Sequence, residues 1–124
     1  QAPPRDICRL AMPGCAHLTT RPHQDHFYIG SSRQLWTAWM PLVDCPLELG
    51  PLALLPGSSR KGLLLHGEGD RGAEVTPDAE WVTAPLAPGD VVLFHCLTVH
   101  RALENRSHDK LRASVDFRYQ PAAG

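Results

Sequence analysis

The sequence predicts an all-β domain, either a sandwich or a barrel. Three observations support this prediction: the apolar segments are short, turn-forming residues separate them at close intervals, and no segment shows convincing helical periodicity. The 12 Pro and 10 Gly residues are distributed along the chain, as expected of turns between strands. A chain of 124 residues accommodates one domain with one hydrophobic core.

The expected elements follow from this pattern in chain order. The first twenty residues lack a regular pattern and are expected to be an irregular lead-in, while residues 61–79 are polar and Gly-rich and predict a long loop with one or two short strands. Apolar or β-branched segments bounded by turn residues predict strands at 27–29, 35–43, 52–55, 81–84, 91–97 and 113–119. The turn Pro88-Gly89-Asp90 leads directly into the strongly apolar segment that begins at residue 91.

Composition argues against several classes of function. A formal net charge of -1 gives no electrostatic footprint for nucleic acid or for a membrane surface. No apolar run approaches the ~20 residues that span a bilayer, and no secretory signal pattern is visible. The four cysteines have neither paired CxxC spacing nor zinc-ribbon spacing, and Cys45 and Cys96 lie in apolar segments. Reduced structural thiols, and therefore a cytoplasmic protein, are expected.

The motif His23-Gln24-Asp25 is the first candidate for chemistry. In an extended segment, residues two apart point to the same face, so His23 and Asp25 could reach one metal ion while Gln24 points away. A second imidazole from elsewhere would complete a 2-His-1-carboxylate set, which occupies one face of Fe(II) and leaves open positions. The H-x-D pattern is short and also arises by chance, so a surface or hydrogen-bonded His23 is the simple alternative.

The second half of the candidate site lies near the end of the sequence. The apolar segment continues to Val99, so His100 is expected at the end of that strand, where a ligand could project into the mouth of a barrel. Arg112 precedes the strand at 113–119, and if these two strands are neighbours, the imidazole and the guanidinium lie close together. An Arg in such a strand is costly to bury without an anionic partner, and a dicarboxylate would be one. Arg118, on the same strand, is expected to face outward.

Other histidines and one aspartate are weaker candidates. His95 is five positions before His100, so simple alternation places it on the opposite face, although it remains an alternative third ligand. His26 follows the motif directly and is expected to support the site rather than to bind metal. Asp116 could pair with either Arg112 or Arg118. The remaining histidines lie in polar segments and are expected at the surface: His17, His66 and His108.

Several stretches occur together in the order of a known family. They are Pro22-His23-Gln24-Asp25-His26, Thr37-Ala38-Trp39-Met40-Pro41-Leu42, Leu49-Gly50-Pro51-Leu52-Ala53-Leu54-Leu55-Pro56-Gly57-Ser58, Gly89-Asp90-Val91-Val92-Leu93-Phe94-His95 through His100, and Arg112-Ala113-Ser114. In these motifs the chain resembles the phytanoyl-CoA dioxygenase family of Fe(II)/2-oxoglutarate-dependent oxygenases. The resemblance covers roughly residues 22–120. It implies one oxygenase domain over residues 1–124, folded as a double-stranded β-helix (a jelly-roll, cupin-like barrel).

The resemblance also implies a metal site. His23, Asp25 and His100 match the family's iron ligands, which are its catalytic residues. Family members are longer and have an N-terminal helical portion that packs on the barrel, and this portion is expected to be missing from the chain. Ser59 stands where the family often has a His that is not an iron ligand, so the metal assignment is unaffected.

The resemblance implies a cosubstrate site as well. Arg112 matches the residue that holds the distal carboxylate of 2-oxoglutarate, and Ser114 stands where its hydroxyl can assist. Trp39 matches a position lining the cosubstrate pocket, although a Trp in an apolar strand is more often a core residue.

The implied reaction uses Fe(II), 2-oxoglutarate and O2 to hydroxylate a small organic substrate, with release of succinate and CO2. The protein would supply geometry and a dry pocket. Three alternatives remain at this stage: a cupin-type metalloenzyme, a zinc hydrolase with two His and one Asp, and a non-catalytic metal- or ligand-binding barrel. The sequence selects neither the substrate nor the oligomeric state.

Overall fold

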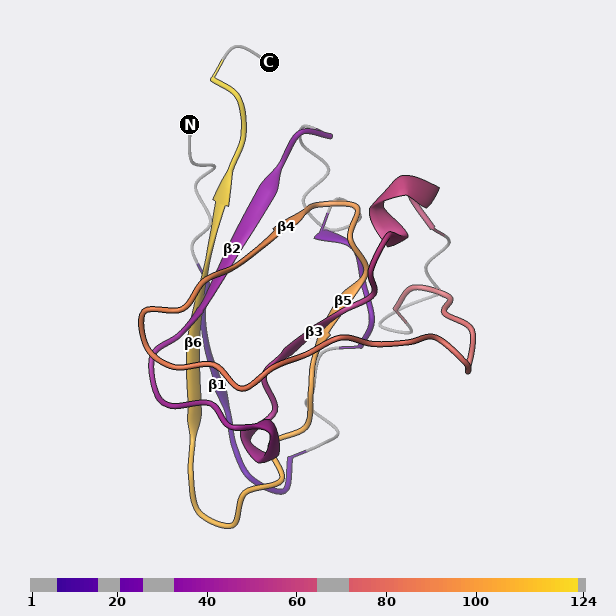
Figure 1. The fold of residues 1–124 in the computed structure, drawn as a ribbon. Coiled ribbons are helices and arrows are strands. Elements are labelled where there is room, and N and C mark those ends of the chain that lie inside the picture. The colour runs from indigo at the N-terminus through magenta and orange to yellow at the C-terminus, as the bar shows by residue number, and fades with distance from the viewer. Residues whose placement is uncertain (1–6, 16–20, 26–32, 65–71, 123–124) are drawn as a thin grey trace.

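The computed structural model describes residues 7–15, 21–25, 33–64 and 72–122, and strands dominate these ranges (Figure 1). Among the described residues, no helix has the length and apolar character needed to cross a bilayer. The elements are, in chain order, β1 (Ile7–Ala11), β2 (Trp36–Pro41), η2 (Leu47–Leu49), β3 (Leu52–Leu54), η3 (Ser58–Lys61), β4 (Val92–His95), β5 (His100–Ala102) and β6 (Arg112–Tyr119).

The strands form two antiparallel sheets that face each other as the two walls of a jelly-roll barrel. The larger sheet has the order β1-β6-β2-β4, and the smaller one pairs β3 with β5. Figure 1 shows the larger sheet along one side of the molecule and β3 and β5 along the other. An isolated bridge between His23 and His100 places the H-x-D segment beside β5. The expected all-β double-stranded β-helix is thereby confirmed.

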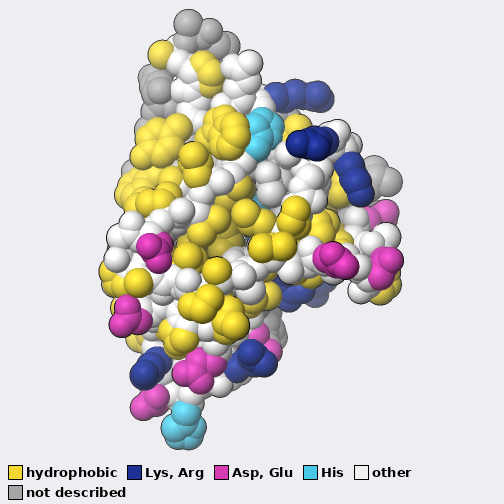
Figure 2. All heavy atoms as spheres, viewed as in Figure 1, with side chains coloured by type: hydrophobic (Ala, Val, Ile, Leu, Met, Phe, Trp, Pro, Cys, Tyr) yellow, Lys and Arg dark blue, Asp and Glu magenta, His cyan; other side chains and the backbone are white. Residues whose placement is uncertain are grey.

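Strand β6 shows how this sheet is oriented. Its buried positions alternate with half-buried ones, so the side chains that face the barrel interior are Arg112, Ser114, Asp116 and Arg118. The opposite side of the sheet, which we call the outer face, carries the exposed apolar side chains Leu10, Trp36, Leu93 and Tyr119. Hydrophobic side chains gather over the upper parts of β2, β4 and β6 in Figure 2. This strand therefore has its polar face inward and its apolar face outward.

Apolar side chains fill the barrel beneath these polar groups. Trp39 from β2, Leu52 from β3 and Phe94 from β4 form one buried cluster that links the two sheets. A second cluster of Leu35, Cys96 and Leu97 closes one end of β2 and β4. Burial of aromatic and aliphatic side chains at such a junction stabilises the fold by roughly 1.5–3 kcal/mol for each large side chain.

Three expectations about the strands are wrong. Ile7–Ala11 is not irregular but forms β1, which pairs with β6 from Ile7↔Asp116 to Ala11↔Arg112. Residues 81–84 form no strand, because Val82 makes only an isolated bridge to Leu54. The segment 91–99 is not continuous, since β4 ends at His95 and a turn at residues 96–98 separates it from β5 in the other sheet.

The expectation that the strand of His100 lies beside the strand of Arg112 is also wrong. β6 pairs with β1 and β2, whereas β5 pairs with β3 across the barrel. The two side chains therefore reach the interior from opposite walls. The predicted strand at 27–29 lies outside the described residues. Residues 62–64 and 72–79 form a loop as expected, but these described residues contain none of the one or two short strands predicted for this segment.

The cysteines provide a test of this fold. No disulfide joins the four cysteines; Cys8 is exposed, Cys15 is half-buried, and Cys45 and Cys96 are buried. Burial raises the pKa of the Cys45 and Cys96 thiols, so the reactive thiolate is disfavoured at these two positions. We expect a thiol reagent such as DTNB at pH 8 to modify Cys8 and Cys15 quickly and the other two only after denaturation. Rapid modification of all four in the native protein would contradict the packing described here.

Candidate functional site

The structure brings His23, Asp25 and His100 together inside the barrel. One ligand atom from each residue lies within 4.8 Å of the others, and all three residues are buried. The Nε2 atoms of His23 and His100 are 3.5 Å and 3.3 Å from Oδ1 of Asp25. Ligands at right angles around a first-row metal with ~2.1 Å bonds are ~3 Å apart. The three side chains are therefore spaced almost as a metal ion would hold them.

The histidine tautomers favour metal binding. His23 Nδ1 is 2.7 Å from the carbonyl oxygen of Arg21, and His100 Nδ1 is 3.0 Å from that of Thr98. Because a carbonyl only accepts hydrogen bonds, each Nδ1 carries a proton, and each Nε2 faces Asp25. A metal ion that replaced the protons at this point would meet both Nε2 atoms and the carboxylate oxygen together. The donor set of two imidazoles and one carboxylate suits Fe(II).

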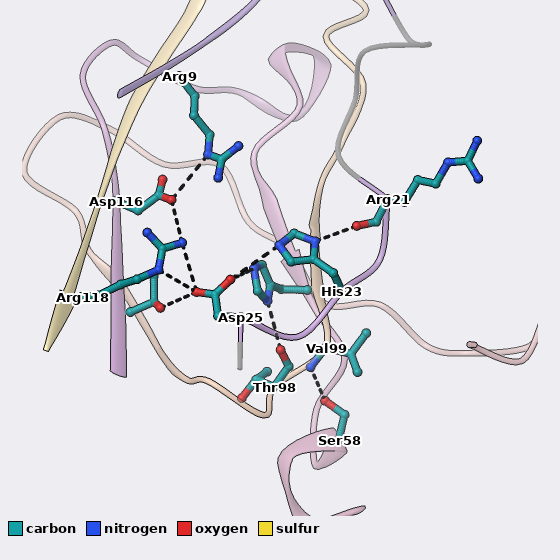
Figure 3. Close-up of polar contacts among 11 residues, drawn as sticks. Arg9, Arg21, His23, Asp25, Ser58, Thr98, Val99, Asp116 and Arg118 are labelled. Carbon is teal, nitrogen blue, oxygen red and sulfur yellow. Dashed lines mark hydrogen bonds and ion pairs between the residues drawn. The ribbon is translucent and has the colours of Figure 1, made fainter. Parts of the chain in front are cut away.

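The carboxylate of Asp25 is buried but remains ionised. Burial by itself raises the pKa of this group, but the contacts with His100 and His23 and the positive charge of Arg118 hold the pKa well below its usual range. Figure 3 shows Asp25 between the imidazole of His23 and the guanidinium of Arg118. A permanently charged ligand is therefore available to a metal at neutral pH.

Gln24 fixes the segment that carries the two neighbouring ligands. Its side chain is fully buried and points away from the cluster, as alternation predicts. The Gln24 amide donates to the carbonyls of Gly62 and Leu97 at 2.8 Å each, and its Oε1 accepts from Leu64 N at 2.8 Å. One side chain thus joins the H-x-D segment to the loop after η3 and to the turn before His100.

Arg112 and Ser114 present polar atoms to the interior. Arg112 Nη1 donates to the carbonyl of Gly50, and its guanidinium carbon lies 5.8 Å from the ring centroid of Trp39. Gly50 has φ 77°, and a Cβ there would collide with the carbonyls of Leu103 and Glu104, so only glycine fits beside this Arg. Among the described residues, buried Arg112 Nε and Ser114 Oγ have no hydrogen-bond partner.

An anionic ligand would satisfy those atoms. Burial lowers the pKa of the Arg112 guanidinium, which means that the cation is incompletely compensated where it lies. A carboxylate that accepts from Arg112 Nε and Ser114 Oγ would remove both defects, since buried unpaired donors cost ~1–3 kcal/mol each. The two residues therefore fit the distal carboxylate of 2-oxoglutarate.

Trp39 is a core residue that also borders a small cavity. It belongs to the buried apolar cluster, and it also lines a cavity of about 20 Å³ beside His100. The other walls of this cavity are Arg9, Leu52, Phe94, Ala102, Asp116 and Arg118. A cavity of this volume has room for about one water molecule, so a larger ligand requires side chains to move.

Arg118 is the functional residue that the sequence interpretation misplaced. It does not face outward: it is buried and donates through Nε to Asp25 Oδ2 at 3.2 Å. Its Nη2 also contacts Asp116 Oδ2 at 3.2 Å, and Asp116 contacts Arg9 Nε at 3.4 Å. The signal was present, because Arg118 is six residues after Arg112 and alternation places both on one face of β6.

The other described histidines, His95 and His108, lie apart from the cluster. His95 is at the end of β4 and its ring packs edge-on against Trp36 on the outer face, 5.3 Å between centroids. Its Nδ1 accepts from the backbone of Leu97. His108 is exposed, as expected. The expectations for His17, His26 and His66 fall outside the described residues.

The comparisons with known proteins agree with this geometry. The model of the family described as phytanoyl-CoA dioxygenase (PhyH) matches residues 8–114. A 1-deoxypentalenic acid 11-beta-hydroxylase from Streptomyces arenae is 40% identical over 115 residues, which cover 82% of this chain and 41% of that protein. The chain thus spans about two fifths of the length of this curated relative.

This chain is also similar to solved structures of two proteins in complex with 2-oxoglutarate. The epimerase SnoN from nogalamycin biosynthesis, in complex with Fe3+, alpha ketoglutarate and nogalamycin RO, is 33% identical with a TM-score of 0.75, over 94% of this chain and 48% of that one. EvdO2 from Micromonospora carbonacea var. aurantiaca, complexed with 2-oxoglutarate, is 30% identical with a TM-score of 0.71, over 94% of this chain and 51% of that one.

Gln24 can be tested through stability. Replacing it with Leu keeps the volume but leaves the carbonyls of Gly62 and Leu97 and the amide of Leu64 without this partner. Each lost partner costs ~1 kcal/mol or more, so we expect the free energy of unfolding to fall by about 3 kcal/mol, measured by urea denaturation. An unchanged free energy of unfolding would refute the anchoring role.

The choice of His100 over His95 can be tested by metal binding. Replacing His23 or His100 with Ala should weaken binding of Mn2+ by more than the ~100-fold that loss of an outer partner can cause, because a ligand is lost. His95→Ala should bind Mn2+ like the wild type, since its ring packs on the outer face. Calorimetric titration measures both, and loss of binding in His95→Ala but not in His100→Ala would reverse the assignment.

Proposed function

Because this chain belongs to the phytanoyl-CoA dioxygenase family, we propose that it is the catalytic barrel of an Fe(II)- and 2-oxoglutarate-dependent dioxygenase that hydroxylates a small organic substrate. The observation that carries the proposal is the buried cluster of His23, Asp25 and His100, with both Nε2 atoms within 3.5 Å of one carboxylate oxygen. Iron bound there with 2-oxoglutarate and O2 supplies the oxidation, which yields succinate, CO2 and a hydroxylated product.

The chain's own residues bind the metal and the cosubstrate and exclude water. His23, Asp25 and His100 would hold the metal and leave positions for the cosubstrate and O2. Arg112 and Ser114 would bind and orient the distal carboxylate of the cosubstrate, and the guanidinium of Arg112 lies over the ring of Trp39. Phe94, whose ring is 4.4 Å from that of His100, excludes water from the metal ligands together with Leu52.

The unpaired atoms of Arg112 and Ser114 favour this function over the alternatives. A buried guanidinium with an unpaired donor can bind the distal carboxylate of a 2-oxo dicarboxylic acid. The reactions of a cupin-type metalloenzyme or a zinc hydrolase do not require such a group. The hydroxylase among the relatives supports hydroxylation and a small-molecule substrate. A cytoplasmic location is part of the proposal and is supported by the absence of a disulfide among four cysteines, which suits a reducing compartment.

Cosubstrate binding tests the proposal directly. The full-length protein, mixed anaerobically with Fe(II) and 2-oxoglutarate, should show the visible charge-transfer absorption of the chelated metal. Arg112→Gln should weaken 2-oxoglutarate binding about 10- to 100-fold, because a charge-assisted hydrogen bond is worth ~1.5–3 kcal/mol. Ser114→Ala should have a smaller effect in the same direction. Metal content should stay at the wild-type level in both variants.

A surface variant is the control for this experiment, and two further outcomes decide whether the proposal holds. Arg106→Gln removes an exposed guanidinium and should leave 2-oxoglutarate binding unchanged. A wild-type protein that binds Fe(II) without developing the absorption with 2-oxoglutarate would be a metal-binding barrel of another kind. Formation of succinate in air, dependent on Arg112, would complete the case for an oxygenase.

A further inference from the structure

We propose that Thr37 and Arg118 are positioning residues that turn the Asp25 carboxylate so that only Oδ1 faces the metal, and that Asp116 in turn fixes Arg118. This inference rests on the proposed function, because it concerns how the same metal site is organised. It assigns work to three buried polar side chains that the metal and cosubstrate assignments leave without a role.

The two oxygens of Asp25 have different partners. Oδ2 accepts a hydrogen bond from Thr37 Oγ1 at 2.6 Å and contacts both Nε and Nη2 of Arg118 at 3.2 Å. Oδ1 instead faces the Nε2 atoms of the two histidines at 3.3 and 3.5 Å. Three donor contacts occupy the lone pairs of Oδ2, so this oxygen has little capacity left for a metal ion. The carboxylate therefore offers the metal one oxygen.

The pairing register of β2 and β6 places both donors beside Asp25. Thr37 and Arg118 are directly opposite each other on the neighbouring strands β2 and β6, and both face the interior. Side chains in such opposed positions lie ~5 Å apart at Cβ, close enough to bind one carboxylate together. Because the sheet fixes both donors, the orientation of Asp25 is set before any metal arrives, which is the condition for a preorganised site.

Asp116 holds Arg118 in this position. Its Oδ2 contacts Arg118 Nη2 at 3.2 Å and Arg9 Nε at 3.4 Å (Figure 3). The charges of Asp25, Arg118, Asp116 and Arg9 thus alternate from the metal position toward β1. A buried guanidinium with a carboxylate on each side is both neutralised and fixed in its plane.

A purely electrostatic role for Arg118 makes the opposite prediction. Removing a positive charge beside a cation site would strengthen cation binding, whereas removing a positioning group should weaken it. Thr37 separates the two effects further, since Thr37→Val removes a hydrogen bond without changing any charge. Arg118→Lys keeps the charge but loses the planar fork that contacts Asp25 and Asp116 together.

The experiment measures Mn2+ affinity by calorimetry and the visible absorption of the Co2+ form, which reports coordination geometry. Thr37→Val should weaken Mn2+ binding about 10-fold and Arg118→Gln about 10- to 100-fold, the range known for outer partners of metal ligands. Arg118→Lys should remain weakened despite its charge, Thr37→Ser should bind like the wild type, and Asp116→Asn should show a smaller loss. The Co2+ spectrum should change in each weakened variant.

Matched controls separate positioning from general destabilisation. Ser107→Ala removes a half-buried hydroxyl that donates to Asn105 Oδ1 at 2.7 Å in the segment between β5 and β6, and it should leave Mn2+ binding and the Co2+ spectrum unchanged. Thermal melting of the metal-free variants shows which of them fold. If Arg118→Gln does not fold, Thr37→Val and Arg118→Lys decide the question.

Two results would overturn the inference. Folded Thr37→Val and Arg118→Lys variants with wild-type affinity and an unchanged Co2+ spectrum would show that Asp25 needs no help, and tighter binding by Arg118→Gln would show a purely electrostatic role. A wild-type protein that does not bind Mn2+ through His23, Asp25 and His100 would instead defeat the proposed function itself. The two failures are therefore distinguishable.

Discussion

The burial of one carboxylate charge, that of Asp25, constrains much of this structure. An ionised carboxyl group inside a protein must be surrounded by donors or cations, because the cost of leaving water is otherwise prohibitive. Here the partners come from β2, β5 and β6 and from the segment of Asp25 itself. Both sheets of the barrel are therefore tied to a single group, and the metal site lies where their contributions meet.

The polar interior explains the unusual pattern of β6. Most strands of half-buried sheets place apolar residues inside, yet the inward side chains of β6 are two arginines, a serine and an aspartate. Such an interior is stable only where each charge has a partner, and Asp116 supplies one for Arg118. Unsatisfied polar atoms remain on all four residues, at Arg112 Nε, Ser114 Oγ, Asp116 Oδ1 and Arg118 Nη1. Asp116 and Arg118 are nevertheless joined by an ion pair, whereas Arg112 and Ser114, the two residues assigned to the cosubstrate, have no carboxylate partner among the described residues.

Sequence reasoning recovered what depends on local geometry. Two-residue alternation correctly placed His23 and Asp25 on one face. His95 is separated from His100 as expected, but for a different reason, because the chain leaves β4 and enters the other sheet between them. It did not recover β1 or the change of sheet between His95 and His100, because these depend on pairing between distant segments. Arg118 was misplaced for a different reason: an outward orientation suits a charged side chain on solvation grounds, and its buried partner Asp25 could not be known without the strand order.

The order β1-β6-β2-β4 has a consequence for how the molecule folds. The central pairing of this sheet requires β6, which follows all the other strands along the chain. During synthesis, β2 can pair with β4 well before residues 112–119 are available, but β1 has no partner in the sheet until they are. Closing such long loops is slow, since entropy is lost before contacts form. Arg118 therefore reaches Asp25 only when β6 has joined the sheet, so this contact and the closure of the sheet are formed together.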